Sequence, residues 1–94
     1  MKQNIIHKLV GYHAKTGRMV YEHDVPQGVL RLVKDIANVA RDDPDAIGSY
    51  RLSPRQAREI ASVLNLELPQ ELSFSLEPFD LDWGKKPPEL GITN

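Results

Sequence analysis

Residues 50–77, YRLSPRQAREIASVLNLELPQELSFSLE, contain the two clearest structural patterns of the chain. The first is a capping box, in which Ser53 is the N-cap residue, Pro54 takes the first helical position and Gln56 reaches back to the cap. This box predicts a helix over residues 54–65, with Asn65 as its left-handed stop. The apolar residues at helical spacing, which we expect to be buried, are Ala57, Ile60, Ala61 and Leu64.

The second pattern is the alternation of apolar and polar residues in LSFSLE, residues 72–77. Because successive side chains of a strand point to opposite faces, this pattern predicts a half-buried strand with Leu72, Phe74 and Leu76 facing the core. We expect Pro78 to end the strand.

The residues before this stretch predict a hairpin and a first helix. Residues 4–13 and 18–24 are rich in strand-forming residues and flank a turn at residues 14–17, in which Gly17 can take a positive φ. Pro26 then precedes apolar residues at three- and four-residue spacings, which predict a helix over residues 27–41. The sequence Asp42-Asp43-Pro44-Asp45 is expected to end this helix.

A short strand at residues 50–52 completes the predicted element order, β-β-α-β-α-β. This order predicts an α+β fold with a mainly antiparallel sheet and two helices on one face. We expect residues 1–78 to form a single α+β domain. Residues 79–94, which contain prolines and glycines and show no periodicity, are expected to form an irregular C-terminal tail.

The composition is that of one small globular domain. Of the 94 residues, 40% are hydrophobic and 27% are charged, which are ordinary values for a folded protein. The absence of cysteine excludes disulfide bonds, a thiol nucleophile and any cysteine-ligated metal. No apolar run is long enough to span a membrane, and residues 1–10 lack the apolar core of a signal peptide. We therefore expect a cytoplasmic protein that has no membrane partner.

Charge is distributed unevenly along the chain. Residues 1–41 hold seven basic and three acidic residues, whereas residues 42–94 hold five basic and ten acidic residues. The near-neutral total, −1, argues against nucleic acid as the main partner, because phosphate binding needs a basic face. The acidic half instead favours a basic protein partner.

The chain offers no pattern that is typical of an enzyme or a metal site. His7 and His13 are six residues apart in the predicted strand, about 20 Å at ~3.3 Å per residue, so one ion cannot bind both. The Asp42–Asp45 cluster contains Pro44 and lacks the distant glutamate of a calcium loop. We expect no catalytic residues, no metal and no cofactor; an enzyme that uses His7, His13 and His23 is the weakest interpretation.

An alternative function is that of a DNA-associated regulator. The segment from Ser53 to Leu66 resembles the first helix and turn of a helix-turn-helix motif. The recognition helix should follow, but residues 67–72 are acidic and contain Pro69. This acidity would repel phosphate, which makes DNA binding the second interpretation.

The chain resembles a loosely defined group of small bacterial α+β proteins. The resemblance covers most of residues 5–77 and is carried by the turn Lys15-Thr16-Gly17, the sequence Asp42-Asp43-Pro44, the Tyr50-x-Leu52 pair, Gln56-Ala57 and the strand Phe74–Glu77. Some similar proteins are encoded beside bacterial toxins and look like immunity proteins. The resemblance implies a protein-binding role by association and assigns no functional residue.

We therefore predict a small protein-binding module, most concretely an immunity protein or inhibitor that covers the basic active site of a toxin such as a nuclease. The candidate partner-binding residues are the acidic residues of the second half and the single tryptophan: Asp42, Asp43, Asp45, Glu67, Glu71, Asp80, Asp82 and Trp83.

Overall fold

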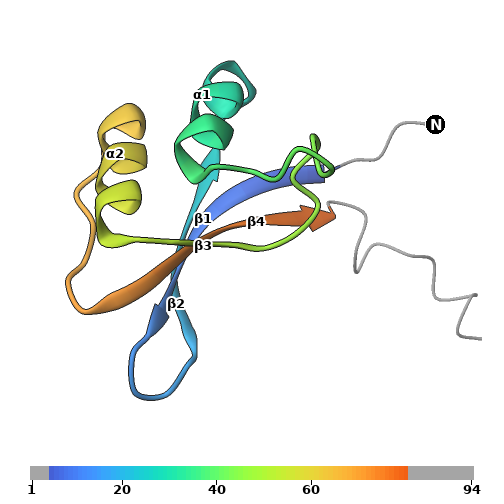
Figure 1. The fold of residues 1–94 in the computed structure, drawn as a ribbon. Helices are drawn as coiled ribbons and strands as arrows, with labels where there is room; N and C mark the ends of the chain where they lie inside the picture. Colours follow the sequence, from blue (N-terminus) through green and yellow to red (C-terminus); the bar gives the residue numbers. More distant parts are fainter. Residues whose placement is uncertain (1–4, 81–94) are drawn as a thin grey trace, which may run out of the picture.

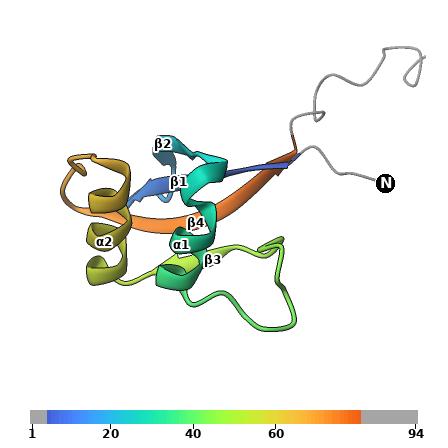
Figure 2. The same cartoon turned by 90° about the horizontal axis from the view of Figure 1, so that it is seen from above.

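The computed structural model describes residues 5–80, which form one antiparallel sheet covered by two helices. The elements are β1 (Ile5–His13), β2 (Met19–Val25), α1 (Gln27–Ala37), β3 (Tyr50–Leu52), α2 (Pro54–Leu64) and β4 (Leu72–Asp80). The strands lie in the order β2-β1-β4-β3, and every neighbouring pair is antiparallel. Both helices lie on the same face of the sheet (Figures 1 and 2). The α+β fold and its element order are confirmed.

The core fills the space between the helices and the sheet. The two central strands contribute Leu9 and Leu76, which are paired across the ladder and are both fully buried. Val33 and Ile60 are the fully buried residues of the two helices. The rest of this cluster comes from β2, β3, β4 and the two helices: Val25, Leu30, Ala37, Leu52, Ala57 and Phe74.

Helix α2 begins with the predicted capping box. The Gln56 backbone N–H donates to Ser53 Oγ at 3.1 Å, and the Ser53 backbone N–H donates to Gln56 Oε1 at 2.8 Å. The other end of the Gln56 amide donates to the Ile36 carbonyl at 3.0 Å, so the same residue joins α2 to α1. Asn65 ends the helix in the left-handed region at φ 59°, as predicted.

Helix α1 is shorter than the sequence predicts, because Asn38 ends it and the aspartates do not. Asn38 adopts φ 60° and ψ 50°, a left-handed conformation that asparagine tolerates better than most residues. The Asn38 N–H donates to the Asp35 carbonyl, and the Val39 N–H donates to the Lys34 carbonyl. Residues 38–41, predicted as helix, belong to the following loop.

Strand β4 continues through Pro78, where we expected it to end. Pro78 is paired with His7 of β1, and the strand runs on to Asp80. On its other side, β3 begins at Tyr50, which pairs with Leu76. At Pro78 strand β4 therefore has only one neighbouring strand, and proline is tolerated at such an edge because no second ladder needs its N–H. The rest of the predicted tail lies outside the described residues.

The hairpin of β1 and β2 turns at residues 14–17, where Gly17 has the expected positive φ of 72°. Its register, which the sequence leaves open, pairs Leu9 with His23, and one irregularity lies between Gly11 and Tyr12. Gly11 allows an aromatic ring to approach the backbone, because a Cβ there would lie 2.9 Å from Cε1 of Phe74.

Candidate functional site

The loop between α1 and β3, residues 38–49, is closed by a single carboxylate; we call it the acidic loop. Asp43 Oδ1 accepts the Ile47 N–H at 2.9 Å, and Oδ2 accepts the Gly48 N–H at 2.9 Å and the Tyr50 hydroxyl at 2.6 Å. These bonds, led by that of Tyr50, hold the pKa of Asp43 below its ordinary value. Asp43 therefore acts within the loop, with both oxygens already bonded.

A buried histidine fastens the acidic loop to the sheet. His7 is 6% exposed, and its Nε2 lies 3.1 Å from the Asp45 carbonyl and 3.0 Å from the Ala46 carbonyl. Both acceptors are carbonyl oxygens, so Nε2 carries the proton and donates. His7 therefore has a structural role, because its ring is buried and holds the loop against the sheet. The sequence does not predict this contact, because the neighbours of His7 on the helix side of the sheet depend on the strand register.

The acidic loop presents two of its aspartates to solvent. Asp42 and Asp45 are exposed, and Ile47 beside them keeps 49% of its surface. Asp80, the last residue of β4, lies at the same end of the sheet, because it follows Pro78, the strand partner of the His7 that bonds the loop. The structure thus brings together three of the predicted partner-binding residues: Asp42, Asp45 and Asp80.

Two other predicted residues lie at the opposite end of β4. Glu67 and Glu71 are exposed residues of the loop between α2 and β4 and line an open groove of about 940 Å³. The nine-residue strand from Leu72 to Asp80 separates the two ends by roughly 26 Å at ~3.3 Å per residue. The predicted set therefore divides into two separate surfaces. Asp82 and Trp83 lie outside the described residues.

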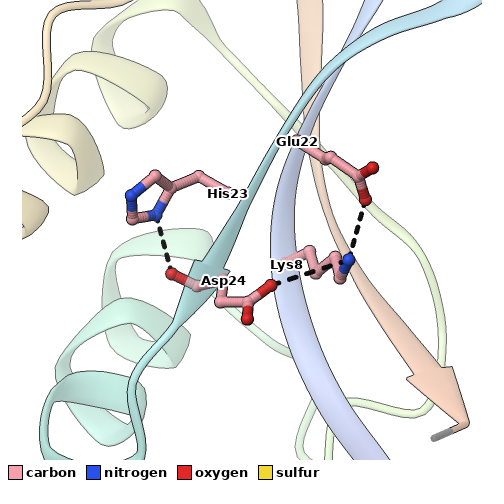
Figure 3. Close-up of polar contacts among 4 residues, drawn as sticks. All are labelled: Lys8, Glu22, His23 and Asp24. Atoms are coloured by element: carbon pink, nitrogen blue, oxygen red, sulfur yellow. Dashed lines mark hydrogen bonds and ion pairs between the residues drawn. The ribbon is translucent and has the colours of Figure 1, made fainter.

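The sheet face that carries no helix, here called the open face, holds a row of charges that sequence reasoning missed. Lys8 of β1 donates to Glu22 at 2.8 Å and lies 3.6 Å from an oxygen of Asp24, both on β2 (Figure 3). The hydrogen bond to Glu22 is the main cause of the raised pKa of Lys8. The Lys8 ammonium also lies 5.2 Å from the centre of the Phe79 ring.

A second polar group lies on the open face between β1 and β4. Tyr12 donates its hydroxyl to Glu77 Oε2 at 2.6 Å, and Ser75 donates its hydroxyl to the same oxygen at 2.7 Å. The bond to the carboxylate, with partial burial, raises the pKa of Tyr12 to about 12. Only the polar alternation of residues 73, 75 and 77 signals this group in the sequence, because its partner Tyr12 depends on the register of β1 against β4.

The described part of the chain contains neither a metal-binding cluster nor a membrane-spanning helix. Among residues 5–80, no group of three or more histidine, aspartate or glutamate side chains is placed to hold a metal ion. Within the same range, neither helix is long and apolar enough to cross a bilayer.

The fold and these surfaces define a four-stranded antiparallel α+β domain with an exposed acidic loop. Residues 6–77 match the model of a family described as "Domain of unknown function (DUF7683)", and the chain belongs to that family. Searches of the curated proteins and of the solved structures found no match. The function must therefore be argued from the residues themselves.

Proposed function

We propose that this protein is a small protein-binding module, most concretely an immunity protein or inhibitor whose acidic loop covers the basic active site of a toxin such as a nuclease. The observation that carries the proposal is the internal closure of this loop by Asp43 and His7, which leaves Asp42 and Asp45 exposed. A loop already fixed in one conformation loses little entropy when it binds.

The charge and composition of the loop suit a basic protein surface. Residues 38–49 hold three aspartates and one arginine, and the exposed Ile47 adds apolar area next to the carboxylates. Complementary charge speeds the encounter of two proteins, while apolar contact at the centre of an interface slows their separation. Asp80, at the end of β4, adds a carboxylate at the same end of the sheet.

Asp82 and Trp83 complete the proposed binding set, since they follow Asp80 in the sequence. Trp83 supplies the aromatic anchor, and Trp83→Ala should speed dissociation and weaken binding by about 2 kcal/mol or more. If Trp83 packs on its own domain instead, the same variant lowers the melting temperature of the free protein and leaves the dissociation rate unchanged.

The geometry adds no support to the DNA-binding alternative. Within residues 5–80, α2 is followed by a loop and then by β4, so no second helix is placed after it as a helix-turn-helix requires. Protein binding therefore remains the function that we propose.

The test uses the product of the gene beside this one, which we expect to be a toxin. Expressed alone, it should arrest growth, and co-expression of this chain should restore growth. The double variant Asp42→Asn/Asp45→Asn should lose protection. The matched control, Glu67→Gln/Glu71→Gln, removes the same charge at the other end of β4 and should protect like the wild type. A harmless neighbour, or full protection by the Asp42/Asp45 variant, would contradict the proposal.

A further inference from the structure

The open face contains a polar hollow whose lining includes Ser49, the last residue of the acidic loop, and otherwise lies outside that loop. Its volume is about 360 Å³, and it lies where β1, β3 and β4 meet the hairpin turn. Its polar lining comes from residues far apart in the sequence: Tyr12, His13, Arg51, Ser73, Ser75 and Glu77. Convergence of several polar side chains on one concavity is typical of small-molecule sites.

One side of this hollow is a carboxylate that is already oriented. Tyr12 and Ser75 both donate to Oε2 of Glu77, and no residue of the described chain donates to Oε1. Ser75 is 6% exposed, so its hydroxyl is fixed by burial as well as by the hydrogen bond. Glu77 is thus held in place and retains one oxygen that can accept a donor from a ligand.

The other side of the hollow carries an uncompensated positive charge. Arg51 of β3 pairs with Ser75 in the ladder, so it lies diagonally across from Glu77 on the same face. Among residues 5–80, Arg51 forms neither an ion pair nor a side-chain hydrogen bond. Two opposite charges therefore flank one hollow without joining each other.

We propose that this hollow binds a small zwitterion, namely a free α-amino acid. The ligand ammonium donates to Oε1 of Glu77, and the ligand carboxylate accepts from the Arg51 guanidinium. Both bonds are charge-assisted, and the arginine fork matches the geometry of a carboxylate. Ser73 and His13 line the hollow with further polar atoms for the ligand.

The experiment is an NMR titration of the whole chain with glycine, L-serine and L-glutamine. We expect saturable shifts of the backbone amides of Tyr12, Arg51 and Ser75, with a dissociation constant of roughly 1 mM or tighter for at least one of them. N-acetyl-L-serine lacks the ammonium and L-serinamide lacks the carboxylate, and each should bind at least roughly tenfold more weakly than L-serine.

Two variants test which residue binds each charged group of the ligand. Glu77→Gln should weaken L-serine but leave N-acetyl-L-serine unchanged, whereas Arg51→Ala should weaken L-serine but leave L-serinamide unchanged. Glu77→Gln keeps an acceptor for Tyr12 and Ser75, and its fold is checked by the unchanged spectrum of the helices. The pKa of Tyr12 should fall from about 12 towards its ordinary value of 10.0 in this variant, which verifies the carboxylate contact independently.

No saturable shift with any amino acid would overturn the proposal. Equal binding of the blocked and free compounds would do so as well, because it would show that the two charges are not recognised. Neither outcome bears on the acidic loop as a protein-binding surface, because the two substituted residues, Arg51 and Glu77, lie outside that loop.

Discussion

The two loops that follow the helices begin in the same way and end differently. Asn38 and Asn65 have nearly identical left-handed conformations, with φ of 60° and 59°. The acidic loop then closes through the Asp43 carboxylate and His7. In the loop of residues 66–71, no side-chain hydrogen bond is formed; Leu66 and Leu68 instead pack against the core.

The same helix stop therefore does not determine how the loop after it is held in place. The left-handed asparagine only redirects the chain, and the next residues determine whether polar bonds or apolar packing fixes it. Polar closure leaves the remaining side chains free to face solvent, as Asp42 and Asp45 do. Apolar packing leaves an open groove beside α2.

Of the variants that test this comparison, His7→Ala should lower the free energy of unfolding most. It removes a buried ring and leaves the Asp45 and Ala46 carbonyls without their donor, so we expect a loss of about 3 kcal/mol in the free energy of unfolding. Urea denaturation measures the loss. The exposed His13 is the control: its Nδ1 accepts the N–H groups of Lys15 and Thr16 in the exposed turn, where water can replace it, so His13→Ala should cost about 1 kcal/mol at most. Equal losses in the two variants would show that His7 does not anchor the loop.

Replacing either helix stop by alanine should destabilise the protein equally. Alanine pays a steric penalty in the left-handed region, so Asn38→Ala and Asn65→Ala should each cost about 1 kcal/mol. Thermal and urea denaturation of the two variants side by side gives the comparison. A loss confined to one variant would mean that the two stops are not equivalent.

The pH dependence of stability should report on Asp43. Its pKa is lowered in the folded state, so its contribution is complete above the unfolded value near 3.8 and is lost as the pH falls through the lower, folded value. Asp43→Asn places an N–H₂ group among the donors of Ile47, Gly48 and Tyr50, and should lower the melting temperature by a few degrees at neutral pH. The variant should also lose this acid-dependent component; an unchanged acid profile would exclude Asp43 as its source.

Glu71→Gly should change the free energy of unfolding least, and it should raise the stability that the preceding variants lower. Glu71 has φ of 65° at the end of the loop of residues 66–71, a conformation that glycine adopts without strain. Relief of this strain exceeds the added freedom of the unfolded chain, so stability should rise by about 0.5 kcal/mol. A decrease on urea denaturation would show that the glutamate side chain makes a stabilising contact.

The sequence was sufficient where the determining contacts are local. The Ser53 capping box, the Asn65 stop and the element order follow from residues within a few positions of one another. The end of α1 was misplaced because Asn38 and the Asp42–Asp45 cluster are both credible stops, and the first one reached ends the helix. Pro78 was misjudged because its tolerance depends on the short length of β3, which is a property of the assembled sheet.

The site was less predictable, because it depends on contacts between distant residues. The carboxylates were found by their charge, but their division between two ends of β4 required the strand order. The bonds from His7 to the acidic loop, and from Tyr12 to Glu77, join residues 38 and 65 positions apart. Neither pair leaves a local signature.

The central claim is tested most directly by the association rate constant between this protein and the neighbouring gene's product, measured by stopped flow over a range of ionic strengths. The account predicts that Asp42→Asn/Asp45→Asn slows association and flattens its salt dependence, because exposed charges act through the long-range field. Glu67→Gln/Glu71→Gln should keep the wild-type rate and salt dependence. Equal association rates for the wild type and both variants at every ionic strength would contradict the acidic loop as the binding surface.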